Sequence, residues 1–202
     1  AAFLSQVRKH HTLALFSAVR LHHTQAMMNM RQVLEAGACA AYAIANSDVA
    51  DFGDDDQGII YPSDALTKKR YKWLEENYKT GSDAIKKMKG SINNSAAHSN
   101  IVYAQKNFKF NTESGTFETP FFDMEDDYHV KTDLWMIGNV IIGLIDLFYG
   151  VNKGRDVIKF ADDFIPRLKA LEKQNEKLKN EMMQTDRFKA AQKIDGTSAN
   201  SA

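Results

Sequence analysis

The sequence predicts a mainly α-helical bundle of about five to six helices, with a short β-hairpin insertion and a long C-terminal helix. Apolar residues recur in steps of three and four over long stretches, and residues 134–149 are nearly all apolar. Two short segments of alternating polarity flank a turn within 107–119. With 202 residues, 44% of them hydrophobic, the chain can bury one core.

The N-terminal segment, from about Phe3 to Asn46, lacks Pro and has one Gly, at position 37. Its apolar or small positions, with one His, lie three or four residues apart at Leu15, Val19, His22, Ala26, Met30, Val33, Gly37, Ala41 and Ile44. This spacing predicts one long amphipathic helix, or two helices in series.

Turn-forming and acidic residues over 47–58 predict a surface loop. A second helix is expected to begin at Ser63-Asp64, directly after Pro62, and to end near Tyr78. A third helix follows, with Gly81–Asp83 as its N-terminal cap. Its apolar positions are Ile85, Met88 and Ile92.

The second half of the chain begins with a hairpin and a central helix. Residues 107–111 and 116–119 alternate apolar with polar side chains around Thr112–Gly115, which predicts a β-hairpin. The apolar stretch over 134–149 contains Asn139 and Asp146 and is shorter than the roughly 20 residues that cross a bilayer. We therefore expect it to be the buried central helix.

The last helical region shows a heptad pattern from Ala161 to Met182, with Asn175 at an a position. Pro166 either kinks this helix or lies in its first turn, which would shorten the pattern. The predicted organisation is a helical bundle over 1–155, an amphipathic helix over 156–192 that packs on the bundle or on a partner, and a disordered tail over 193–202.

Composition restricts the function classes. Lys plus Arg and Asp plus Glu both number 26, so no overall field attracts nucleic acid or anionic lipid, and such binding needs a local patch. We expect no membrane partner. Cys39 is the only cysteine, which excludes an intramolecular disulfide and a Cys-based zinc site and favours a reducing, cytoplasmic setting.

The first candidate site is the pair Arg31 and Glu35, four residues apart on one helix face. The small residues of Gly37–Ala41 allow another helix to approach closely, which would bury the pair. A simple structural ion pair is the alternative interpretation, since such pairs often only fix packing.

The second candidate site is the polar segment 91–100. Asn94 and His98 would share a face of a helix, as would Ser91 and Ser95, and His98 titrates near neutral pH, as a general acid or base requires. The alternative is a capped or solvated helix end, since Asn and Ser often terminate helices. A cluster of cations, Lys86, Lys87 and Lys89, precedes the segment.

Other chemistry finds little support in the sequence. His11 and His22 would be roughly 16 Å apart on one helix, so they cannot share a metal ion without a partner helix. The acids of 51–56 lack the spacing of a calcium loop. Cys39 is interpreted as a small buried hydrophobe. The sequence predicts neither a metal site nor a cofactor, and it has no glycine-rich phosphate loop.

A helix with Arg31-x-x-x-Glu35, followed by a segment with Ser95-x-x-His98, resembles the HEPN superfamily of helical bundles, including its abortive-infection and uncharacterised branches. The resemblance covers roughly residues 12–150. It implies a dimer whose paired motifs meet at one cleft, and in many members metal-independent RNA cleavage in defence and toxin systems. In the family motif four to six residues separate an Arg from the His, and here the positions that this Arg would occupy hold Ser91, Ile92 and Asn93.

The resemblance therefore favours a non-catalytic binding or regulatory module in a bacterial-type stress or defence system, with a homodimer or protein partner bound through helices. The alternative is a metal-independent enzyme that cleaves RNA or a nucleotide phosphodiester. Its candidate catalytic residues are His98, Arg31 and Glu35, and its candidate ligand-binding residues are Asn94, Ser95 and Asn100. A third possibility is that these side chains only satisfy a polar core.

Overall fold

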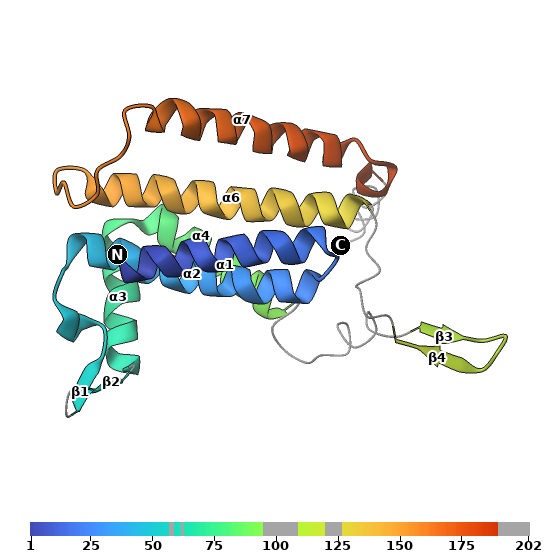
Figure 1. The fold of residues 1–202 in the computed structure, drawn as a ribbon, viewed down its shortest axis with the longest axis horizontal. Coiled ribbons are helices and arrows are strands. Elements are labelled where there is room, and N and C mark those ends of the chain that lie inside the picture. The colour runs from blue at the N-terminus through green and yellow to red at the C-terminus, as the bar shows by residue number, and fades with distance from the viewer. Residues whose placement is uncertain (57–58, 62, 95–108, 120–126, 190–202) are drawn as a thin grey trace, which may run out of the picture.

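The protein is mainly α-helical, with two small antiparallel hairpins (Figure 1). The computed structural model describes residues 1–56, 59–61, 63–94, 109–119 and 127–189. The predicted fold class is confirmed. The helices are α1 (Ala2–Val19), α2 (His23–Ala45), α3 (Asp64–Asn77), α4 (Lys79–Ile92), α6 (Asp127–Asn152) and α7 (Phe164–Met183).

The N-terminal segment forms a helical hairpin. The prediction left open one long helix or two helices in series, and the structure has two. Helices α1 and α2 pack side by side in opposite directions (Figure 1). The chain turns at Leu21, whose φ of 60° lies in the left-handed region, and the His22 N–H donates to the Ser17 carbonyl at 2.9 Å. This conformation is unfavourable for Leu, and packing of α1 on α2 offsets it.

The face of α1 that points into the bundle is also different from the predicted one. Its buried residues are Val7, Ala14 and Ala18, whereas Leu15 and Val19 are exposed. Small side chains on the inner face let the backbones of α1 and α2 approach closely. Leu15 and Val19, the large apolar residues of the predicted pattern in α1, therefore point outward.

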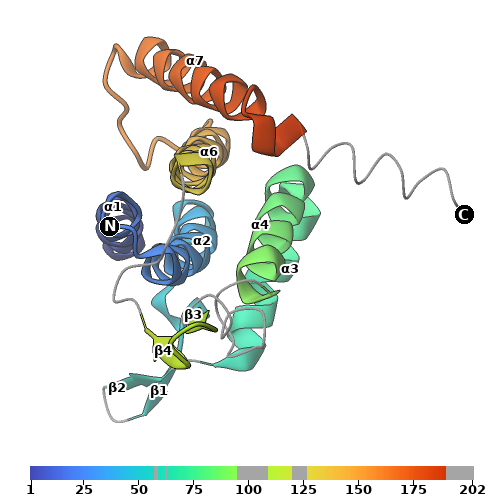
Figure 2. The same ribbon diagram turned by 90° about the vertical axis from the view of Figure 1, so that its right-hand side faces the viewer.

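Helix α2 is the centre of the bundle, with α1, α3, α4 and α6 packed around it (Figure 2). Its small residues receive α6: a Cβ atom on Gly37 would lie 2.7 Å from Cδ2 of Leu144. The prediction that Gly37–Ala41 admits another helix is thus confirmed at Gly37. That contact does not bury Arg31 and Glu35, whose side chains stay 30% and 35% exposed.

Helix α6 contains the helix predicted over 134–149 and extends it at both ends, but the centre of the bundle is α2, so the predicted central position is wrong. By length and composition it is apolar enough to cross a membrane, with a mean hydropathy of 1.8. It packs against α1, α2, α4 and α7, and 33% of its most apolar window is buried. One helix of this kind is weak evidence for a membrane span.

Helix α7 lies along α6 of the same chain (Figures 1 and 2). Asn175 of α7 packs against Gly138 of α6: a Cβ atom on Gly138 would lie 2.5 Å from Oδ1 of Asn175. The Thr132 hydroxyl donates to Sδ of Met182 at 3.0 Å. Pro166 lies in the first turn and Ala161 precedes the helix, so the heptad pattern is shortened. Within the described residues, this pattern packs on the bundle.

The remaining elements are short. The segment predicted as a loop contains the 3-10 helix η1 (Val49–Asp51) and strand β1 (Asp54–Asp56). Strand β1 pairs with β2 (Ile59–Tyr61), because local backbone pairing needs no strong hydrophobic pattern. Strands β3 (Lys109–Asn111) and β4 (Thr116–Glu118) form the predicted hairpin. The predicted tail over 193–202 lies outside the described residues.

Helix boundaries around Tyr78 correct one further prediction. Helix α3 begins where predicted, and Ser63 is its N-cap, whose hydroxyl accepts from the Leu66 N–H at 3.5 Å. Helix α4 already begins at Lys79, so Gly81–Asp83 lies within its first turns and does not cap it. Gly81 is instead placed against α6, where its Cβ would lie 3.3 Å from Leu147.

Candidate functional site

A group of polar side chains connects α2 to α3 and α4. We call it the polar cluster and define it by Arg31, Glu35, Tyr71, Lys89 and Asn93. The Arg31 Nε donates to Glu35 Oε1 at 3.2 Å, and Lys89 Nζ lies 3.0 Å from the same oxygen. The Arg31 Nη1 donates to Asn93 Oδ1 at 2.7 Å. Side chains separated by up to 62 positions in sequence thus form one network.

Helix periodicity explains how the cluster is assembled. Arg31 and Glu35 lie one turn apart on α2, and Lys89 and Asn93 lie one turn apart at the end of α4. Packing of α4 on α2 brings the two pairs together. From α3, Tyr71 accepts a hydrogen bond from Lys89 Nζ at 3.0 Å, and this ammonium lies 4.9 Å from the centre of the Tyr71 ring.

The cluster has more positive than negative side chains, because Arg31 and Lys89 share one carboxylate. Burial alone would lower the pKa of Lys89, but its hydrogen bonds to Tyr71 and Glu35 outweigh burial and raise that pKa. Lys89 therefore stays protonated at neutral pH and cannot act as a base. The network is only partly buried, so an anion from solvent can reach it.

Within the described residues, the guanidinium of Arg31 has donors that no protein group uses. The Nε of Arg31 donates to Glu35, and Nη1 donates to Asn93. The third nitrogen, Nη2, makes no hydrogen bond within the described part of the chain. A planar guanidinium with a donor pair left over suits a phosphate or carboxylate oxygen. Arg31 is thus both a structural tie and a candidate ligand contact.

The predicted site residues are only partly within the described structure. Arg31 and Glu35 interact as predicted, and Asn94 is exposed directly after α4. Ser95, His98 and Asn100 lie outside the described residues. Sequence analysis did not identify Tyr71 or Asn93 as cluster members. The four-residue spacing of Lys89 and Asn93 was the available signal for the α4 half.

Cys39 lies near the cluster without the properties of a nucleophile. Burial raises the pKa of its thiol, and the nearby Arg70 guanidinium opposes this only in part. A thiol with a raised pKa carries little thiolate at neutral pH, and thiolate is the reactive form. Cys39 is therefore a half-buried structural side chain.

The histidines make separate contacts. His10 Nδ1 lies 2.9 Å from Asn29 Oδ1, and His23 Nδ1 lies 2.7 Å from Asp133 Oδ2 in a largely buried pair between α2 and α6. The buried Nε2 of His11 has no hydrogen-bond partner among the described residues. In that same part of the chain, no three His, Cys, Asp or Glu side chains form a group that could hold a metal ion.

A groove of about 570 Å³ lies beside the cluster, between α4 and α6. Its walls are mostly apolar, and its lining includes Leu34, Ile85, Met88, Leu144 and Leu147. None of the cluster residues lines it. The polar chemistry of Arg31 and the apolar groove are therefore separate features of the α2–α4 region.

Comparison with known proteins adds no relative. No protein-family model, curated protein sequence or solved structure matches this chain. The function is therefore inferred from the residues of the polar cluster and from the motif resemblance.

Proposed function

We propose that the chain is a HEPN-like helical bundle that serves as a non-catalytic binding or regulatory module. In this proposal it acts as a cytoplasmic dimer in a bacterial-type stress or defence system, and the polar cluster contacts an anionic ligand such as RNA or a nucleotide. The observation that carries the proposal is the hydrogen bond from Arg31 to Asn93. Asn93 precedes His98 by five positions in the sequence, so this bond joins Arg31 to the described end of the segment that leads to His98.

The chemistry of the cluster supports binding better than catalysis. Two cations and one carboxylate leave a positive excess, and Arg31 has an unused donor nitrogen within the described part of the chain. Phosphate groups bind well to such Arg sites through charge-assisted hydrogen bonds. Lys89 is held protonated by its partners, so it does not supply a base.

Binding of a short, fluorescently labelled single-stranded RNA tests the proposal. We expect Arg31→Ala to raise the Kd about tenfold, which corresponds to about 1.4 kcal/mol. Arg167→Ala on α7 is the matched control, because it removes the same charge from an exposed position away from the cluster. Equal effects of the two substitutions, or no measurable binding by the wild-type protein, would contradict an RNA-binding cluster.

The ribonuclease alternative is favoured by the same bond, which ties a guanidinium to the chain five residues before His98. In this alternative His98 is the general acid or base, Arg31 stabilises developing negative charge, and Glu35 and Asn94 orient the site. Ser95 and Asn100 remain its candidate ligand contacts. RNA cleavage in EDTA that His98→Ala abolishes would replace the binding module with this enzyme. We expect no cleavage.

The dimer is tested by sedimentation of the full chain at micromolar concentrations. A monomer under these conditions would remove the dimer from the proposal and leave the ligand site to be judged by RNA binding alone. The heptad pattern offers no separate support, because in the described residues it packs on α6.

A further inference from the structure

The outward-facing side of α1 is unusual in composition. We call it the α1 outer face and define it by Arg8, Lys9, Leu13, Leu15, Phe16, Val19 and Arg20. Its four apolar side chains are 40%, 38%, 54% and 55% exposed in chain order, while the inner face of the helix buries Val7, Ala14 and Ala18. Large apolar groups on the outer side, opposite the small buried Ala14 and Ala18, indicate a surface that another body covers.

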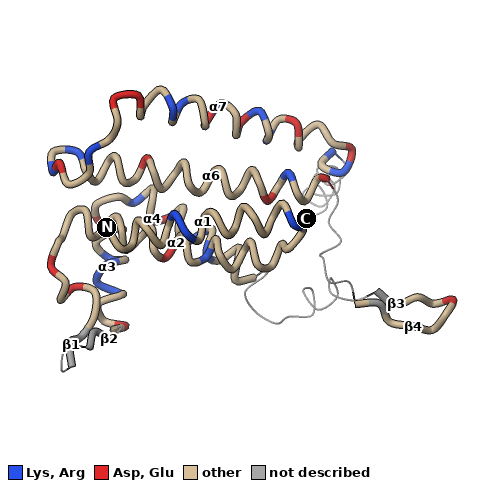
Figure 3. Tube along the Cα trace, viewed as in Figure 1, with Lys and Arg blue, Asp and Glu red and all other residues tan. Residues whose placement is uncertain are grey.

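The charges on this face are all of one sign. Arg8, Lys9 and Arg20 are exposed and have no ion-pair partner among the described residues. Residues 1–34 contain no Asp or Glu, and Glu35 is the first acid in the chain. Figure 3 shows Lys and Arg along α1 without an acidic residue on that helix. The overall neutrality of the protein therefore conceals a local basic patch.

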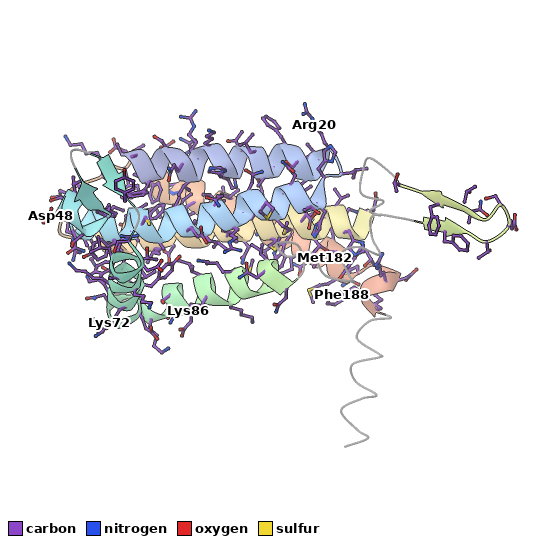
Figure 4. All side chains as sticks on the ribbon, turned by 90° about the horizontal axis from the view of Figure 1, so that it is seen from below. Arg20, Asp48, Lys72, Lys86, Met182 and Phe188 are labelled. Carbon is purple, nitrogen blue, oxygen red and sulfur yellow. The ribbon has the colours of Figure 1, made fainter. Side chains whose placement is uncertain are left out.

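The position of α1 makes this patch a ridge. Helices α2 and α6 pack on one side of α1, and seen end-on α1 lies at the edge of the bundle (Figure 2). Figure 4 shows α1 along the same edge, with Arg20 at its C-terminal end. From Arg8 to Arg20 the helix is about 18 Å long, at 1.5 Å per residue. The face is thus a narrow, outward-curved strip.

We infer that the α1 outer face docks on an anionic lipid surface. The helix lies parallel to the membrane, Leu13, Phe16 and Val19 enter the boundary between headgroups and acyl chains, and the flanking cations contact lipid phosphates or carboxylates. This inference departs from the expectation that the protein has no membrane partner. A neutral protein needs a local basic patch to bind anionic lipid, and the α1 outer face is such a patch. It does not depend on the polar cluster.

Charge decides against a second copy as the occupant. Two α1 outer faces in contact would bring the Arg and Lys residues of both copies together with no carboxylate from either helix to neutralise them. The form of the surface decides against nucleic acid, because exposed Leu, Phe and Val side chains gain little from a phosphate backbone. A bilayer offers both anionic headgroups and an apolar layer beneath them.

Co-sedimentation with lipid vesicles tests the inference with the full chain. The two vesicle types are pure phosphatidylcholine and phosphatidylcholine with about 30% phosphatidylserine. We expect binding to the anionic vesicles only, weakening as salt is raised. The double variant Phe16→Ser/Val19→Ser should lose most of this binding, whereas Val157→Ser, at another exposed apolar position, should keep it.

The charge requirement has its own matched control. Arg8→Gln/Lys9→Gln/Arg20→Gln should weaken binding about a hundredfold, taking about fivefold per cation. The control Lys72→Gln/Arg167→Gln/Lys177→Gln removes the same net charge from exposed positions on α3 and α7 and should bind nearly as the wild type does. All these positions are exposed, so far-UV circular dichroism should be unchanged in every variant.

Three outcomes would overturn the inference. The wild-type protein could bind both vesicle types equally or not at all. The two charge variants could lose binding equally, which would show a general charge effect. Finally, a lipid-free dimer that Phe16→Ser/Val19→Ser converts to a monomer would show that a second copy covers the face. None of these variants alters Arg31, so RNA binding is tested separately.

Discussion

The contact between Gly37 of α2 and Leu144 of α6 should be highly sensitive to one added methyl group. A Cβ atom on Gly37 would lie 2.7 and 2.8 Å from the two terminal methyls of Leu144 and 3.3 Å from its Cγ, whereas ordinary contacts are 3.4–4 Å. Leu144 is buried, so its side chain has little room to move. Gly37→Ala therefore forces the Leu144 side chain into a new position.

The expected magnitudes follow from two opposing effects. Replacing Gly by Ala inside a helix favours folding by about 1 kcal/mol. Overpacking the α2–α6 contact should cost about 2 kcal/mol, which leaves Gly37→Ala about 1 kcal/mol less stable than the wild type. Leu144→Ala should cost about 3 kcal/mol through lost burial and the cavity that remains.

The double variant gives the decisive value. With Leu144 shortened, the methyl group introduced by Gly37→Ala no longer meets the terminal methyls of the leucine, and only the helix-propensity gain remains. Gly37→Ala/Leu144→Ala should therefore lose about 2 kcal/mol, about 2 kcal/mol less than the single effects would give together. The measurement is the free energy of unfolding from urea titrations followed by circular dichroism.

A control separates packing from helix propensity. A Cβ atom on Gly90 of α4 meets nothing within 4 Å among the described residues, so Gly90→Ala should stabilise the protein by about 0.5–1 kcal/mol. The reasoning fails if Gly37→Ala stabilises the protein as Gly90→Ala does. It also fails if the Gly37 and Leu144 effects add within about 0.5 kcal/mol.

Three further perturbations test buried polar groups. His23→Ala removes the partner of the nearly buried Asp133 and should cost about 3 kcal/mol in urea unfolding; a loss below about 1 kcal/mol would contradict this. Asn152→Ala leaves the N–H and carbonyl of Ile158 without their side-chain partner, so thermal unfolding should show a loss of about 2 kcal/mol. Burial lowers the pKa of His11 below its ordinary value of 6.5, opposed by a hydrogen bond with the Ile137 backbone. The unfolded chain therefore takes up a proton before the folded one, stability should decrease as pH falls below 6.5, and His11→Leu should make this decrease smaller; an unchanged pH profile would refute the assignment.

Hydrophobic periodicity was sufficient to predict the helices but not how they turn. The hairpin of α1 and α2 contains no Gly or Pro at its turn, and Leu21 adopts a left-handed φ that Leu rarely takes. Two hydrogen bonds, from the Leu21 and His22 N–H groups to the Ala18 and Ser17 carbonyls, close this turn, and packing of α1 on α2 adds to them. Packing is a tertiary property that local sequence signals do not contain. Pro166, by contrast, is a local signal, and one of its two predicted positions is the observed one.

The candidate site divides in the same physical way. Arg31 and Glu35 are neighbours on one helix, so their interaction follows from the repeat of the helix alone. The contacts of Arg31 with Asn93 and of Glu35 with Lys89 depend on where α4 crosses α2, which the spacing of residues within either helix does not determine. The pairing within α2 was therefore predictable, whereas the contacts that α2 makes with α3 and α4 were not.

The misassigned face of α1 bears directly on function. A periodicity search gives weight to large apolar residues and so places Leu15 and Val19 in the core. Close packing against α2 instead selects Ala14 and Ala18 for the inner face, since small side chains let helix backbones approach. Leu15 and Val19 then have no structural task inside the bundle, yet each is exposed at an energetic disadvantage in water. These apolar side chains lie next to cations that have no ion-pair partner among the described residues. An external partner that is both anionic and apolar would explain this arrangement. The outer face of α1 is therefore the first surface on which to measure binding.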